Sequence, residues 1–112
     1  MKKEENPDTL FIDSYRNSKV LKVLGVEIRV RIMELLQKQE LNITEIAQQL
    51  DIPQSTATTS ILALEKAGLV DSHIANGVKG GQKVCTAKYR DIFIALNPPD
   101  LPKDNNVIEC EV

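Results

Sequence analysis

The segment from Asn42 to Val70, NITEIAQQLDIPQSTATTSILALEKAGLV, constrains the fold of this chain more than any other part. Asn42, with a glutamate three residues later, is typical of a helix that begins with a capping box. Pro53 cannot continue that helix but is suited to leading a second one, which the spacing of apolar residues extends over about residues 54–67. Gly68 allows the left-handed backbone that ends a helix. The segment therefore predicts two helices joined by a tight turn.

A glycine- and lysine-rich turn follows these helices. Residues 69–75 alternate loosely and predict a strand, residues 76–81 (NGVKGG) are a turn cluster, and residues 82–87 predict the returning strand. Two helices followed by such a hairpin are the elements needed to place one helix in the major groove of DNA and a β-loop beside it. The predicted fold class is α+β, mainly α: a winged helix-turn-helix with a two-stranded β-hairpin wing.

Two further helices are predicted before this segment. The first is capped by Ser14 or Ser18 and continues to about Leu24, where Gly25 interrupts it. The second covers residues 26–38, and its apolar spacing predicts one buried stripe. The stripe consists of Ile28, Ile32 and Leu35.

The length of 112 residues fits one domain with a modest core. Residues 1–17 are predicted to form a mobile, polar N-terminal arm with a compact apolar patch at residues 10–12. Residues 18–96 are predicted to form the winged-helix domain, and the apolar residues 92–96 at its end are compatible with strand or helix. Residues 97–112 begin as a proline-rich linker and end in a strand-like run, which predicts the start of a further domain beyond Val112.

Charge is distributed unevenly along the chain, although the net charge of −2 gives no general nucleic-acid signal. Residues 76–90 hold four basic residues and no acid, whereas residues 91–112 hold five acids and one lysine. The four are Lys79, Lys83, Lys88 and Arg90. These residues predict a local basic surface for contact with nucleic acid. A solvated charged turn is an about equally good interpretation of the same residues. Tryptophan is absent, and phenylalanine and tyrosine number two each, so the chain offers no aromatic platform for stacking single-stranded bases.

Several classes of protein are disfavoured by features that the sequence lacks. No apolar run approaches the roughly 20 residues of a membrane span, and the first residues do not resemble a secretory signal. Two cysteines, Cys85 and Cys110, are too few for a disulfide framework. These features predict a cytoplasmic protein. For Cys85 we favour a buried strand residue over a redox switch, because free cysteine packs readily as a small hydrophobe.

Residues 53–57 (PQSTA) and 64–70 (LEKAGLV) resemble the recognition-helix signature of ArsR-type winged-helix repressors. Residues 21–24 (LKVL) and 28–36 (IRVRIMELL) resemble the paired first helices of that family. The resemblance covers roughly residues 18–88 and implies a transcriptional repressor that binds duplex DNA. The family's metal-binding cysteine pair is replaced by Asn42 and Thr44, and the only histidine is His73. We therefore expect no metal ion and no cofactor, and the effector remains unidentified.

Polar residues of the second helix that lie away from its buried face (Ala57, Ile61 and Leu64) are the expected base contacts. They are Gln54, Ser55, Thr56, Thr58 and Thr59. Glutamine can pair with adenine through two hydrogen bonds, and serine or threonine can bond several base edges or phosphates. A helix-capping role for Ser55 or Thr56 is the alternative. In the wing, Lys79, Gly80 and Lys83 are expected to contact phosphates or the minor groove.

A single module of this size offers few base contacts, so a homodimer on a pseudo-palindromic DNA site is expected. The candidate dimer surface is formed by residues 10–12 and 92–96, and covering the domain's own core is an equally good interpretation of both. A winged helix used only for docking to another protein is the main alternative function. An enzyme is disfavoured, because His73 has no evident partner for catalysis.

Overall fold

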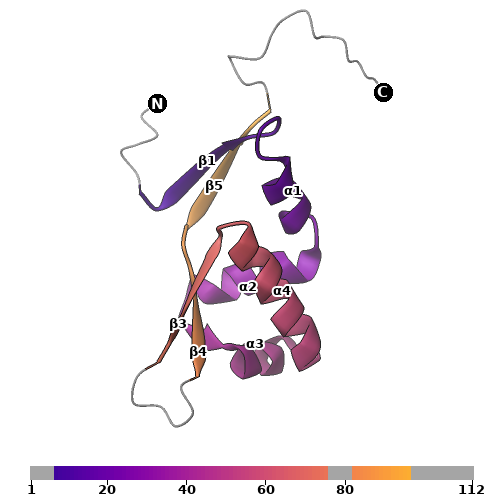
Figure 1. Cartoon of the computed structure of the whole chain (residues 1–112), viewed down its shortest axis with the longest axis vertical. Helices are drawn as coiled ribbons and strands as arrows, with labels where there is room; N and C mark the ends of the chain where they lie inside the picture. Colours follow the sequence, from indigo (N-terminus) through magenta and orange to yellow (C-terminus); the bar gives the residue numbers. More distant parts are fainter. Residues whose placement is uncertain (1–6, 76–81, 97–112) are drawn as a thin grey trace, which may run out of the picture.

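The computed structural model describes residues 7–75 and 82–96 and shows a winged helix-turn-helix with an added two-stranded ribbon (Figure 1). The helices are α1 (Ser18–Leu24), α2 (Glu27–Leu36), α3 (Ile43–Leu50) and α4 (Gln54–Lys66). The strands are β1 (Thr9–Asp13), β2 (Leu41–Asn42), β3 (Val70–Ile74), β4 (Lys83–Ala87) and β5 (Asp91–Ala95). The predicted fold class is confirmed. The predicted wing tip, residues 76–81, and the predicted linker, residues 97–112, lie outside the described residues.

Capping and turn residues mark the ends of helices α3 and α4. The Asn42 side chain accepts a hydrogen bond from the Glu45 amide at 2.8 Å, and the Glu45 carboxylate accepts one from the Asn42 amide at 2.9 Å. This is the predicted capping box, complete in both halves. Asp51 turns the chain with a left-handed φ of 56°, and Pro53 directly precedes α4. Gly68 follows α4 with the predicted positive φ, 80°.

The start of α1 differs from the prediction. Its N-cap residue is Asn17, not Ser14 or Ser18, and no side chain caps the helix. The Asn17 side chain instead accepts a hydrogen bond from the amide of Asp13 at 2.9 Å. This contact joins α1 to the end of β1, a strand that local sequence patterns did not predict.

The buried face of α2 is also shifted from the predicted stripe. Ile32 is buried as expected, but Met33 and Leu36 are buried with it, whereas Ile28 and Leu35 are only half-buried. Helix α2 packs against α1, α3, α4 and β4. Because neighbours cover it from several directions, the buried arc is set by tertiary packing and not by one helical stripe.

One aliphatic core joins the helices to the three-stranded sheet. Its fully buried side chains come from α2, α3, α4, β4 and the residue after Gly68. They are Ile32, Ile46, Ile61, Leu64, Leu69 and Cys85. Burying an aliphatic side chain of this size contributes about 1.5–3 kcal/mol to folding, so these residues fix the position of α4. The prediction that Cys85 is a buried strand residue is confirmed.

Strands β2, β4 and β3, in that order, form an antiparallel sheet that holds the wing beside α3 and α4. The predicted hairpin strands pair in register from Val70 with Ala87 to Ile74 with Lys83. The Asn42 side chain also donates a hydrogen bond to Gln82 at 2.8 Å. The start of α3 is thereby tied to the start of β4.

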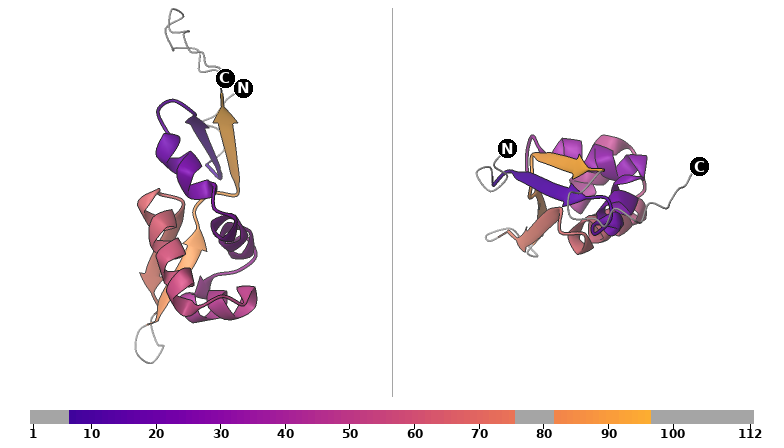
Figure 2. Two further views of the ribbon diagram at one scale, coloured as in Figure 1. Left: turned by 90° about the vertical axis from the view of Figure 1, so that its right-hand side faces the viewer. Right: turned by 90° about the horizontal axis from the view of Figure 1, so that it is seen from above.

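Strands β1 and β5 form a parallel ribbon at the end of the molecule opposite the wing (Figure 1, Figure 2). The expected mobile arm therefore contains a strand, and residues 91–95, where strand and helix were both possible, are a strand. Phe11 pairs with Phe93, and their ring centres lie 5.3 Å apart. The two strands come from opposite ends of the described chain, so no local sequence pattern could reveal this pairing.

Candidate nucleic-acid interface

Helix α4 has a buried face and an opposite exposed face. Ala57, Ile61 and Leu64 have no exposed surface, as their spacing predicts. The opposite face presents a row of exposed residues that we call the α4 ridge. The α4 ridge consists of Ser55, Thr59, Leu62 and Lys66. Its members are separated by three or four residues, which brings their side chains to one side of a helix.

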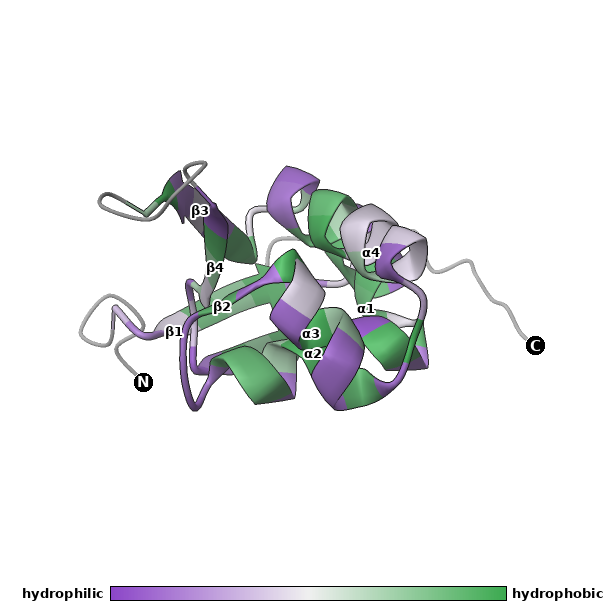
Figure 3. Ribbon diagram, turned by 90° about the horizontal axis from the view of Figure 1, so that it is seen from below, coloured by the Kyte–Doolittle hydropathy of each residue, from purple (hydrophilic) through white to green (hydrophobic). Residues whose placement is uncertain are grey.

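Hydropathy changes along α4, as Figure 3 shows in the view from below. The first half, next to α3, is coloured as intermediate or hydrophilic, hydrophobic residues follow it, and the last turn is hydrophilic again. Leu62 is 50 % exposed and lies on the outer side. The end of α4 that follows the turn is thus suited to polar contacts, and Leu62 adds an apolar contact further along.

Hydroxyl groups at the start of α4 are held by the helix backbone. Thr58 Oγ1 donates to the carbonyl of Gln54 at 3.0 Å, and Thr59 Oγ1 donates to the carbonyl of Ser55 at 2.9 Å. With its proton engaged in this way, each threonine oxygen is free to accept a hydrogen bond from outside. Thr56 is half-buried at the side of the helix.

The alternative that Ser55 or Thr56 caps α4 is wrong. The N-cap residue is Pro53, and no side chain makes a capping hydrogen bond there. Gln54 and Ser55 are both exposed. The structure therefore presents both side chains at the surface of the first turn of α4.

In the wing, the predicted contact residue Lys83 is part of an ion pair. Its Nζ lies 3.2 Å from Oε1 of Glu65 on α4, and both side chains are only partly exposed. This bridge fixes the base of the wing to α4. Lys79 and Gly80, the other predicted wing contacts, lie outside the described residues.

The basic residues of the stretch 76–90 that the structure describes, from residue 82 to residue 90, do not form one surface. Lys88 lies near the ring of Tyr89, with 5.9 Å between Nζ and the ring centre. Arg90 pairs with Asp91 at 3.2 Å and lines an apolar groove beside α2, which is away from the wing. Sequence proximity suggested a single basic surface, but the chain turns from β4 into β5 between these residues and separates them.

Three basic residues near α4 were not among the predicted contacts. Lys19 and Lys22 of α1 and Lys66 of α4 surround an open groove of about 480 Å³ between the two helices. The sequence signal was the spacing of Lys19 and Lys22, which puts them on one side of α1. That α1 packs close enough to α4 to bring Lys66 to the same groove was a matter of tertiary structure.

Neither cysteine chemistry nor metal binding is supported by the described part of the chain. Burial raises the pKa of the Cys85 thiol above its usual value, which disfavours the reactive thiolate. His73 is an exposed residue of β3. Within residues 7–75 and 82–96, no three His, Cys, Asp or Glu side chains are placed to hold a metal ion, and no helix is long and apolar enough to cross a membrane.

The helix-turn-helix matches a known family of regulators. Residues 27–72 fit the family model described as "Bacterial regulatory protein, arsR family". This range includes α2, α3, α4 and the start of β3. The comparison with curated proteins gives no significant match.

Solved structures with the same fold include transcriptional regulators from several bacteria. A homodimeric winged helix-turn-helix DNA-binding domain from Mycobacterium bovis, a possible ArsR-family regulator, is 25% identical with a TM-score of 0.57, and the match covers 63% of this chain and 62% of that one. The regulator HlyU from Vibrio vulnificus is 26% identical with a TM-score of 0.57, over 69% of this chain and 76% of its own. The transcriptional repressor BigR from Xylella fastidiosa shares the fold at 23% identity and a TM-score of 0.54, over 62% of this chain and 67% of its own.

Proposed function

Residues 27–72 of this chain carry the helix-turn-helix of the bacterial ArsR regulator family, and from this premise we propose that the protein is a repressor that binds a specific duplex DNA site. The observation that carries the proposal is the division of α4 into a fully buried apolar face and an exposed ridge with polar residues at its start. The buried face holds the helix rigidly, and the ridge enters the major groove.

Base readout is assigned to the first two turns of α4. Gln54 and Ser55 are exposed and reach base edges, and the amide of Gln54 fits the two hydrogen-bonding groups of adenine. The oxygens of Thr58 and Thr59 already donate to the helix, so they accept from base amino groups. Leu62, in the third turn, contacts a thymine methyl group. This set of side chains favours a site rich in A·T pairs.

Backbone contacts from the wing are assigned to Lys79, Gly80 and Lys83. Each phosphate that a lysine neutralises steepens the dependence of log affinity on log salt by about 0.9. Replacing Lys79 and Lys83 together by alanine is therefore expected to weaken binding to every DNA sequence and to flatten the salt dependence. An unchanged slope would remove the wing from the electrostatic contact.

Sequence-specific binding is tested by fluorescence anisotropy with a labelled duplex from upstream of the gene and a shuffled duplex of the same composition. We expect tighter, salt-sensitive binding to the native duplex. Gln54→Ala is expected to reduce the preference for the native duplex, whereas Gln39→Ala, an exposed glutamine after α2, leaves it unchanged. No binding to either duplex at low salt would support a protein-docking module instead. For repression, deleting the gene should raise transcription from the bound promoter.

We also propose that the protein binds DNA as a homodimer, as the Mycobacterium bovis domain is homodimeric. On β5, Phe93 is 52 % exposed, and Leu96 just after it is 77 % exposed. Such apolar side chains on a strand with an open edge favour association with a second copy. Ile12 and Ile92, by contrast, pack against the domain core. Within residues 10–12 and 92–96, some side chains therefore cover the core, and others are available for a dimer contact.

The dimer is tested by analytical ultracentrifugation at micromolar concentration. Replacing Phe93 and Leu96 together by lysine is expected to give a monomer. Val26→Lys changes an exposed apolar residue between α1 and α2, and this control should leave the dimer intact. A monomeric parent protein at these concentrations would contradict the proposal.

A further inference from the structure

The groove between α1 and α4, which we call the lysine groove, combines several basic side chains with an open surface. Its lining contains three lysines and otherwise only small apolar residues, and no carboxylate takes part. The lining residues are Lys19, Lys22, Val23, Ala63, Lys66 and Ala67. Three ammonium groups around an open, acid-free surface attract an anion that carries several charges.

The lysines of this groove are also unpaired, in contrast to several other basic residues of the described chain. Arg31, Lys83 and Arg90 each form an ion pair with a nearby carboxylate. Within the described part of the chain, Lys19, Lys22 and Lys66 form no ion pair. Glu65, which precedes Lys66, turns to Lys83 on the wing side of α4. The positive charge of the groove is therefore not neutralised from within.

The lysine groove lies beside the α4 ridge. Lys66 is itself the last residue of that ridge, four positions after Leu62. Glu65 marks the side of α4 that faces the wing, and Ala63 and Ala67 mark the side that faces α1. The ridge is thus flanked by the wing on one side and by the lysines of α1 on the other.

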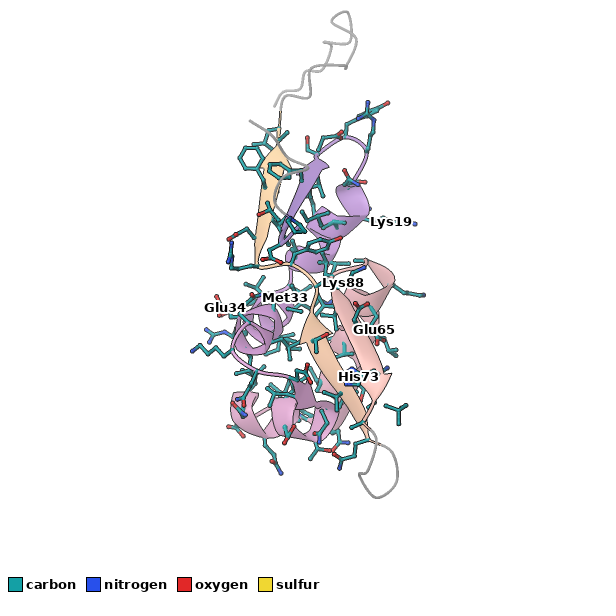
Figure 4. All side chains as sticks on the ribbon, turned by 90° about the vertical axis from the view of Figure 1, so that its left-hand side faces the viewer. Lys19, Met33, Glu34, Glu65, His73 and Lys88 are labelled. Atoms are coloured by element: carbon teal, nitrogen blue, oxygen red, sulfur yellow. The ribbon has the colours of Figure 1, made fainter. Side chains whose placement is uncertain are left out.

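Figure 4 shows on which side of the molecule some of these charged residues lie. Lys19 and Glu65 lie on the side that carries α4, and Glu34 of α2 lies on the opposite side. Three unpaired lysines of a protein whose net charge is −2 therefore lie next to the proposed recognition helix.

We propose that the lysine groove binds backbone phosphates of the DNA duplex. A helix in the major groove lies between two phosphate backbones about 12 Å apart. The wing contacts one of them, and Lys19, Lys22 and Lys66 contact the other. This inference rests on the proposed DNA-binding function and adds a second electrostatic contact to it. Because phosphates carry no sequence information, the groove contributes affinity and orientation, not selectivity.

A purely structural role explains only part of this arrangement. Lys22 and Lys66 lie in the last turns of α1 and α4, where a cation interacts favourably with the helix dipole. Lys19 is the second residue of α1, at the end of the helix where a cation is unfavourable. Local helix stability therefore gives no reason for Lys19, whereas an external anion does.

The test compares two triple variants with the same change in charge. The first replaces Lys19, Lys22 and Lys66 by glutamine. The control replaces three basic residues on or beside α2, on the other side of the molecule. These are Arg31, Lys38 and Arg90, also changed to glutamine. Binding to a mixed-sequence duplex is measured by fluorescence anisotropy across salt concentrations, and circular dichroism confirms that each variant is folded.

If each groove lysine neutralises one phosphate, the first variant flattens the slope of log affinity against log salt by about 2.7 (three times 0.9), and the control leaves it near that of the parent. Arginine at the same three positions should restore the slope. The inference is overturned if the groove variant keeps the parent slope, or if both variants flatten it equally. A parent protein that binds no duplex at low salt would overturn the proposed function as well, so the two failures are distinguishable.

Discussion

The ion pair between Lys83 and Glu65 controls how much positive charge the base of the wing presents. Glu65→Gln removes the carboxylate and frees the ammonium group for a phosphate. We expect DNA affinity to rise, because a phosphate no longer competes with Glu65 for Lys83, and the salt slope to steepen by less than the roughly 0.9 of a whole new phosphate contact. Salt titration by fluorescence anisotropy measures both. Glu34→Gln, on the opposite side, is the matched control, and an equal gain from both changes would show a general effect of net charge (Figure 4).

The free energy of unfolding is expected to depend on pH through the thiol of Cys85. Because burial raises the pKa of the folded thiol, the unfolded thiol ionises first as the pH rises. In that pH range the unfolded state binds fewer protons, so the free energy of unfolding falls with increasing pH. Above a pH of about 8.5, the ordinary thiol pKa, we expect a steeper fall in the parent than in Cys85→Ala. Urea unfolding from pH 7 to pH 10 measures the difference, and parallel curves would contradict it.

At the scale of elements, Asn42 joins the helix-turn-helix to the wing. Its side chain caps α3 and also contacts Gln82 before β4. Asn42→Ala is expected to lower the free energy of unfolding by about 1 kcal/mol, with a range of 0.5–2, through loss of the cap. Gln82→Ala removes only the contact to the wing and should cost less. Urea unfolding distinguishes them, and equal losses would mean that the capping box contributes nothing measurable.

At the scale of the whole molecule, the β1–β5 ribbon is attached to the core by few side chains. Leu10, Ile12 and Ile92 pack against the core, whereas Phe93 and Ile94 are exposed. We expect amides of the ribbon to exchange with deuterium faster than those of α4, because a two-stranded unit is marginally stable by itself. If two ribbons associate in a dimer, raising the protein concentration slows exchange in the ribbon and not in α4. Exchange independent of concentration in both would contradict the dimer surface.

Local sequence determined the helix-turn-helix and the hairpin strands. The capping box at Asn42, the break at Pro53 and the positive φ at Gly68 depend on neighbours within a few residues, so residue type alone reveals them. The buried face of α4 follows from helical spacing in the same way. The candidate base contacts on the first turns of α4 were predictable for this reason, and their role in binding stays a prediction.

Tertiary structure alone decided which distant residues meet. The pairing of β1 with β5, the bridge from Lys83 to Glu65 and the gathering of lysines from α1 and α4 join parts of the chain far apart in sequence. Such contacts form only when the core has fixed the helices, because each depends on the packing of several elements at once. For the same reason Lys83 and Arg90, which are close in sequence, lie on different surfaces of the folded protein.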